Sequence, residues 1–104
     1  MENSDIFDAH REAQDYSTIW DMDQFTNLDA EVVTHARPII LYPYYSRHFE
    51  RVVHVHTYCK SNSVRDVWAA IESAHIKTGD WHQFIETLDL HDEELGVYRV
   101  FVGS

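Results

Sequence analysis

The chain contains few cysteines, glycines and prolines. There is one cysteine, Cys59, with three glycines and two prolines among 104 residues. A single cysteine excludes a disulfide within the chain and is typical of a reducing compartment. Three isolated glycines cannot form the glycine-rich loop that cradles a phosphate group. The sequence therefore offers neither a disulfide framework nor a phosphate-binding loop.

Long hydrophobic runs are also missing. No apolar run approaches the ~20 residues that a membrane span needs, and the acidic beginning of the sequence lacks the basic and apolar regions of a signal peptide. We expect a cytoplasmic protein that does not contact a membrane. Hydrophobic residues make up 44% of the chain and aromatic residues 13%, which is typical of a globular protein. We expect one domain spanning residues 1–104.

Basic residues are scarce and unevenly distributed. Eighteen acidic residues stand against eight lysines and arginines, which gives a net charge of −10 and a pI near 5.0. Residues 1–32 hold nine acids and one base, residues 33–79 three acids and six bases, and residues 80–104 six acids and one base. Because DNA and anionic lipid repel an acidic surface, we expect a protein partner with a basic surface and no direct contact with DNA.

The first half of the chain predicts one helix and one strand. Ser4, the acids that follow it and an apolar spacing of three and four residues predict a helix over residues 5–16. Residues 17–37 have no sustained period and are interpreted as an irregular or partly helical connection. The apolar residues 38–42 predict a strand, which Pro43 ends or places at a sheet edge.

The second half predicts three more strands and a second helix. Residues 49–59 alternate between small apolar and large polar side chains, which is typical of a strand. A helix is predicted to begin after Ser63 and to stop at Gly79. The runs 81–90 and 97–102 predict a hairpin with an acidic turn. The predicted fold is a small α+β domain in the order α-β-β-α-β-β, with two helices on one face of an antiparallel four-stranded sheet.

Two histidines suggest a metal site. His54 and His56 share one face of the predicted strand about 6.5 to 7 Å apart, within reach of one metal ion. The third ligand would come from His48, Glu50, His82 or Glu86. The alternative is that both are half-exposed histidines bonded to their neighbours. Apart from this hypothesis, we expect no cofactor.

Cys59 is the one candidate for a nucleophile. It would need a nearby base, for which His75 and His82 are available in the sequence. The residue shares the apolar face of the strand over residues 49–59, so we predict a buried structural thiol instead.

Tyrosines gather around Pro43, followed by an arginine and a phenylalanine. Aromatic rings and guanidinium groups are enriched at interface hot spots, and Pro43 stiffens the strand. We predict that this segment binds a partner through Tyr42, Tyr44, Tyr45, Arg47 and Phe49. Alternatively, two of the rings complete the core, the segment stacks single-stranded nucleic acid, or it contacts a second copy of the chain in a homodimer.

An acidic row marks the predicted first helix. Its members advance by three or four residues and so share one helical face: Glu2, Asp5, Asp8, Glu12 and Asp15. Such a row can imitate the phosphates of a nucleic acid and occupy a basic groove. The alternative is a solvated helix face, because acids are favoured near a helix N-terminus.

These patterns favour a non-enzymatic interaction protein, specifically a small acidic regulator or inhibitor of a larger protein that itself handles nucleic acid. Two alternatives belong to other classes. One is a small metal-dependent enzyme or sensor centred on His54 and His56. The other is a homo-oligomeric, pH-responsive domain, because the chain has eight histidines whose ordinary pKa is about 6.5.

Overall fold

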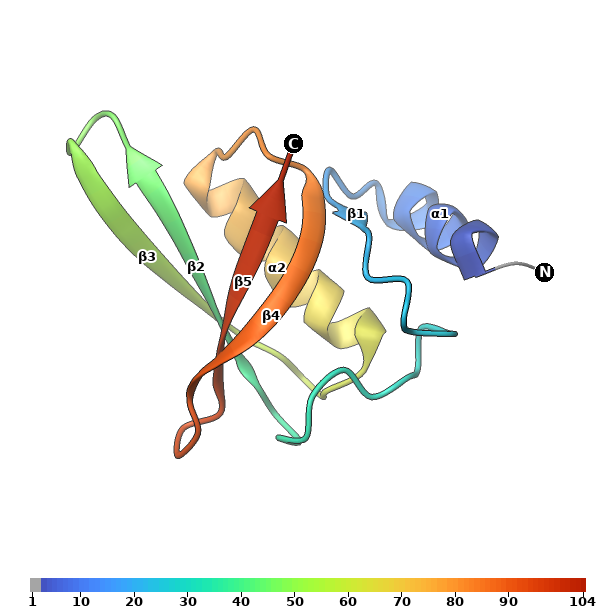
Figure 1. Cartoon of the computed structure of the whole chain (residues 1–104). Helices are drawn as coiled ribbons and strands as arrows, with labels where there is room; N and C mark the ends of the chain where they lie inside the picture. Colours follow the sequence, from blue (N-terminus) through green and yellow to red (C-terminus); the bar gives the residue numbers. More distant parts are fainter. Residues whose placement is uncertain (1–2) are drawn as a thin grey trace.

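The computed structural model describes residues 3–104 and contains two helices and a five-stranded sheet (Figure 1). The predicted α+β class and the two helices are confirmed, and the sheet has one strand more than predicted. In chain order the elements are α1 (Asn3–Gln14), β1 (Ile19–Trp20), β2 (Ile39–Ser46), β3 (Arg51–Tyr58), α2 (Val64–Thr78), β4 (Phe84–Asp92) and β5 (Val97–Gly103).

The sheet is mixed, with the strand order β1-β4-β5-β2-β3. Two antiparallel hairpins, β2–β3 and β4–β5, are joined by parallel pairing of β2 with β5, and β1 pairs parallel with β4. The prediction of a purely antiparallel sheet was therefore wrong. One parallel pair joins the two hairpins, because their inner strands β2 and β5 run in the same direction. The other adds β1 at the outer side of β4. β1 has only two residues, too few to produce an alternating pattern.

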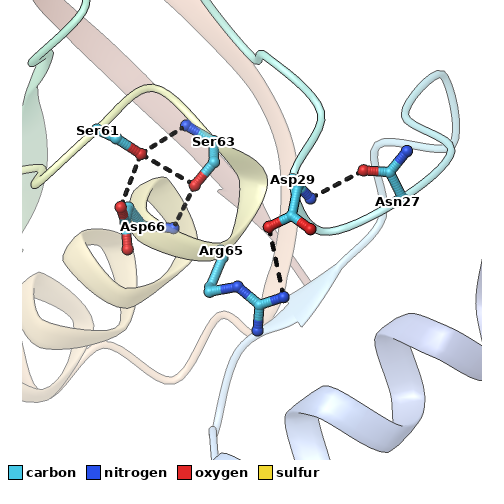
Figure 2. A network of polar contacts seen from close by, with 6 residues as sticks. All are labelled: Asn27, Asp29, Ser61, Ser63, Arg65 and Asp66. Carbon is cyan, nitrogen blue, oxygen red and sulfur yellow. Dashed lines mark hydrogen bonds and ion pairs between the residues drawn. The ribbon is translucent and has the colours of Figure 1, made fainter.

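Helix α2 begins and ends at the predicted residues. Ser63 is the N-cap, and its side chain accepts a hydrogen bond from the Asp66 backbone N–H. The Ser61 hydroxyl donates to the Asp66 carboxylate at 2.7 Å and completes the network that Figure 2 shows. Gly79 ends the helix in the left-handed conformation, with φ of 68°. The face of the helix that packs on the sheet is buried, at Val64, Val67, Trp68, Ile71 and His75.

The core lies between the sheet and α2. Figure 1 shows α2 along one side of the sheet and α1 beyond β1. Phe7 of α1 contacts the rings of Trp20 and Trp68, with centroid distances of 6.5 and 6.2 Å. None of the described helices is long and apolar enough to cross a membrane.

Pro43 neither ends β2 nor places it at the edge of the whole sheet. The Ile39 N–H donates to the Gly96 carbonyl of the β5 side at 2.8 Å. Because backbone groups alternate along a strand, the nitrogen of Pro43 also faces β5. Pairing with β5 ends at Leu41, opposite Arg99. Pro43 therefore occupies a local edge, where the missing N–H loses no sheet hydrogen bond.

Candidate functional site

Figure 1 shows β2 and β5 diverging along their length. Residues of both strands line a cleft in this region. Its volume is about 640 Å³. Three segments contribute most of its lining: residues 43–45 of β2, residues 99–102 of β5, and residues 80–82 between α2 and β4. The cleft thus contains side chains from both faces of the sheet, as expected for a gap between strands.

Large apolar side chains are exposed in this cleft and in the neighbouring β2–β3 turn. We call four residues the aromatic rim: Tyr45, Phe49, Val52 and Trp81, which are 57%, 59%, 53% and 70% exposed. Tyr45, Val52 and Trp81 line the cleft together with Arg47. Phe49 lies in the turn. The cleft therefore places an exposed guanidinium group, that of Arg47, beside the apolar side chains of the rim.

The predicted tyrosine segment divides between surface and core. Tyr45, Arg47 and Phe49 are exposed, whereas Tyr44 is partly buried and packs against the core. Tyr42 is 1% exposed, so its side chain is not part of the surface. Successive side chains of a strand point to opposite faces, which explains why Tyr42 and Tyr44 face α2 while Tyr45 faces away.

A buried network anchors the wall of the cleft formed by residues 80–82. The Tyr42 hydroxyl donates to Asp80 Oδ2 at 2.7 Å, and His82 Nδ1 lies 2.7 Å from Asp80 Oδ1. His75 Nε2 reaches the His82 carbonyl at 2.7 Å. The Trp81 ring stacks on His82 with 3.9 Å between centroids. The segment that carries exposed Trp81 is thus fixed by contacts to β2 and α2.

The network shifts two pKa values. Burial opposes ionisation of Asp80, but hydrogen bonds from Tyr42 and His82 outweigh it and hold the pKa of the carboxyl below its ordinary value of 3.8. Burial and the hydrogen bond to Asp80 raise the pKa of the Tyr42 hydroxyl well above 10.0. Asp80 therefore stays ionised and Tyr42 stays protonated at neutral pH.

The cleft has an Asp–His pair, but no hydroxyl or thiol nucleophile of the Ser, Thr or Cys type among its lining residues in the described part of the chain. Cys59 is buried, as predicted. Burial, followed by the charge of Asp66, raises the pKa of its thiol to about 12. The thiol is thus protonated and inaccessible, which is the opposite of an activated nucleophile.

His54 and His56 lie on the sheet face opposite α2. They line a hollow of about 220 Å³ together with His91 and Arg99. Within residues 3–104, no three His, Cys, Asp or Glu side chains are grouped so that they could hold a metal ion. The guanidinium of Arg99 adds a positive charge to the hollow. The arrangement does not supply the third ligand that the metal hypothesis requires.

The acidic row is only partly helical. Asp5, Asp8 and Glu12 are exposed on α1, whereas Asp15 follows the end of the helix with a φ of 56°. Glu2 lies outside the described residues. The helix predicted to reach residue 16 thus ends earlier, at Gln14.

Arg11 lies near these acids, but its guanidinium donates to the carbonyls of Thr18 and Ser17. Between residues 3 and 104, Asp29–Arg65 is the one carboxylate paired with a lysine or arginine, at 3.5 Å (Figure 2). The carboxylates of α1 therefore keep their charge available to the solvent.

Sequence reasoning missed Asp80 and Trp81 as site residues. The available signal is the Asp-Trp-His order immediately after the glycine that ends α2, because an Asp and a His two residues apart can pair across a turn. The partner that buries Asp80 is Tyr42, 38 positions away in the chain, and no local pattern reveals that contact.

Comparison with protein-family models, curated proteins and solved structures finds no match to this chain.

Proposed function

We propose that the protein is a non-enzymatic interaction module, a small regulator or inhibitor that binds a larger protein through the cleft and its aromatic rim. The observation that carries this proposal is that three exposed apolar side chains, Tyr45, Val52 and Trp81, line one cleft, with Phe49 exposed in the adjoining β2–β3 turn. Contiguous apolar surface of this kind marks interaction sites. Trp, Tyr and Arg are also the residues that contribute most to interface energy.

The anchoring of the segment that carries Trp81 supports the same function. The contacts of Asp80 with Tyr42 and His82 fix the segment that carries Trp81 before any partner binds. A side chain that is already ordered loses less conformational entropy on binding. The lack of a Ser, Thr or Cys side chain among the described lining residues favours recognition over covalent catalysis.

The test is affinity capture of the partner from the source cell, with matched tyrosine variants. Tyr45→Ser and Tyr58→Ser each remove an exposed tyrosine from the same face of the β2–β3 hairpin. The two positions are six ladder steps apart, which is about 20 Å. We expect Tyr45→Ser and Trp81→Ser to reduce affinity by about tenfold or more, and Tyr58→Ser to leave it unchanged. Equal capture by all variants would overturn the proposal.

The acidic row supports a second candidate, in which the protein occupies a basic groove and imitates a nucleic acid. The supporting observation is that Asp5, Asp8 and Glu12 are exposed on α1 and make no ion pair with lysine or arginine within the described residues. Long-range attraction between opposite charges accelerates association with a basic partner. The partner expected from this surface is a protein that handles nucleic acid.

Salt and amide substitutions separate the two candidates. If the acidic row dominates, the triple variant Asp5→Asn, Asp8→Asn, Glu12→Gln loses the partner, and affinity falls steeply as salt rises from about 0.05 to 0.5 M because exposed charges are screened. If the rim dominates, the triple variant keeps most of its affinity and binding resists salt. Affinities measured by calorimetry on the purified pair decide between these outcomes.

A further inference from the structure

Among the described residues 3–104, strand β3 forms one edge of the sheet and has a neighbouring strand on one side only. Its eight residues pair with β2 over their whole length and contain no proline. The pairing of this edge strand is therefore continuous, without the proline or bulge that often protects an edge strand.

Backbone alternation identifies the unpaired groups of this edge. The Cys59 N–H donates to the Pro38 carbonyl on the β2 side at 3.0 Å, so odd-numbered residues of β3 face β2. The even-numbered residues point their N–H and C=O groups outward, at Val52, His54, His56 and Tyr58. An unpaired edge of this kind binds an extended segment as an additional strand.

A groove of about 500 Å³ runs between this edge and α2. Its floor on the helix side is made of small side chains, Ala69, Ala70 and Ser73, which let a main chain approach closely. The Thr57 hydroxyl donates to the Ala70 carbonyl at 2.8 Å and holds the strand against the helix.

The charge of the groove differs from that of the molecule. Lys60 and Lys77 line it and are exposed, and within the described residues neither forms an ion pair. Asp66, the one carboxylate among the described residues that line the groove, accepts a hydrogen bond from the Ser61 hydroxyl. A groove with two free lysines in a chain of net charge −10 is complementary to an acidic ligand.

We infer that this β3–α2 groove binds an extended acidic segment of another protein, which adds to β3 as a sixth strand. Main-chain hydrogen bonds to His54 and His56 supply affinity, and acidic side chains of the segment reach Lys60 and Lys77. A second copy of this chain fits less well, because a symmetric β3 pair brings together two copies of the same edge and its positive charges. The groove lies on the opposite side of the β2–β3 hairpin from the cleft, so the inference stands independently of the proposed function.

The first experiment selects a displayed library of random peptides, about 12 residues long, on the full chain and maps the selected peptides by amide hydrogen exchange. We expect Asp and Glu to be enriched. The outward amides of His54 and His56 should exchange freely in the protein alone and at least about tenfold more slowly with saturating peptide. The inward amides of Val53 and Val55, which already face β2, serve as the internal control and should not change.

Variants test the charge and the space of the groove. Lys60→Gln combined with Lys77→Gln should lower the affinity for the selected peptide by about tenfold or more. Arg47→Gln removes a positive charge from the cleft and should leave this affinity unchanged. Ala69→Glu should abolish binding, because it adds a carboxylate to the groove at an exposed helix position. Thermal melting of each variant establishes that it is folded.

Several outcomes would overturn the inference. They are enrichment of basic peptides, no enrichment, slowed exchange at the cleft instead of at β3, or a β3-paired dimer in sedimentation without peptide. Loss of partner capture in Tyr45→Ser would still support the cleft in each of these cases, so failure of the groove and failure of the proposed function are distinguishable.

Discussion

Two tryptophans, Trp68 and Trp81, occupy opposite kinds of environment in this fold. Trp68 of α2 is 1% exposed, and its indole N–H donates to the Thr18 hydroxyl at 3.0 Å. Trp81, at the cleft, stacks on His82 and remains largely exposed. Folding buries the ring of Trp68 and gives its indole N–H a hydrogen-bond acceptor. The ring of Trp81 is held in place but keeps most of its surface in water. The comparison separates a residue that maintains the fold from one available for binding.

Two buried carboxylates repeat this contrast. Glu72 accepts hydrogen bonds from the backbone N–H groups of Ser17 and Thr18 and from the Thr18 hydroxyl, so it ties the segment after α1 to α2. Asp80 accepts from Tyr42 and His82 and ties the wall of the cleft to β2. One carboxylate joins elements of the core, and the other positions a surface.

The largest loss of stability should come from removing the buried carboxylate of Glu72. Glu72→Ala leaves three donors without their acceptor, so we expect the free energy of unfolding to fall by about 3 kcal/mol. Urea denaturation measures this loss. Glu94→Ala, on an exposed turn, is the control and should change stability by less than about 0.5 kcal/mol. A similar result for both variants would mean that the Glu72 bonds contribute little to stability.

Substitutions of Trp68 and Trp81 should differ in their effect on stability by less than those of Glu72 and Glu94. The buried residue should again be the more sensitive one. Trp68→Phe removes the donor to Thr18 and part of a buried ring, and we expect a loss of about 2 kcal/mol. Trp81→Phe should stay within about 0.5 kcal/mol, because the ring is exposed. Acrylamide quenching provides a second measurement: the accessible fluorescence should disappear in Trp81→Phe and persist in Trp68→Phe. Quenching that survives in Trp81→Phe would contradict the exposure of this residue.

The parts of the fold that could be predicted are those with local signals. Ser63 and Gly79 bound α2, since a cap and a left-handed glycine act within a few residues of their own position. The parallel pairing of β2 with β5 joins residues more than fifty positions apart. It leaves no local signature, so the sequence could not predict it.

The candidate site was predictable to a similar extent. The tyrosine segment was singled out, and the structure exposes Tyr45, Arg47 and Phe49. Period-two alternation separates Tyr42 from Tyr45 in the sequence, but it does not say which face a helix will cover. The role of Asp80 depends on the distant Tyr42 hydroxyl and required the tertiary structure.

A change at the end of α2 tests whether the cleft wall depends on the helix or on the Asp80 network. Gly79 has a φ of 68°, and a Cβ atom added there would meet no atom of the described residues within 4 Å. Gly79→Ala should therefore destabilise the protein by about 1 kcal/mol through backbone strain alone. Gly79→Asn should cost less, because Asn adopts this conformation more readily. The exchange rate of the His82 amide, which donates to Asp80, should stay unchanged if the network holds the wall independently.

The smallest effect concerns pH and again contrasts the core with the cleft. Burial, followed by the charge of Arg65, lowers the pKa of His10 below 6.5, and its buried Nε2 has no hydrogen-bond partner in the described part of the chain. The unfolded chain binds this proton more readily than the folded one. The stability that depends on keeping His10 neutral is therefore fully present above pH 6.5. It declines as the pH falls through that value toward the lowered pKa of His10.

Asp80 also has a lowered pKa, but its contribution is lost only below its ordinary value of 3.8, so the two groups act in separate pH ranges. Melting temperatures at about pH 7.5 and 5.5 isolate His10. We expect His10→Gln to lose less stability on acidification than the wild type, and His91→Gln, at an exposed position, to behave like the wild type. If His10→Gln and the wild type lose the same stability over this range, protonation of His10 is not what couples the core to pH.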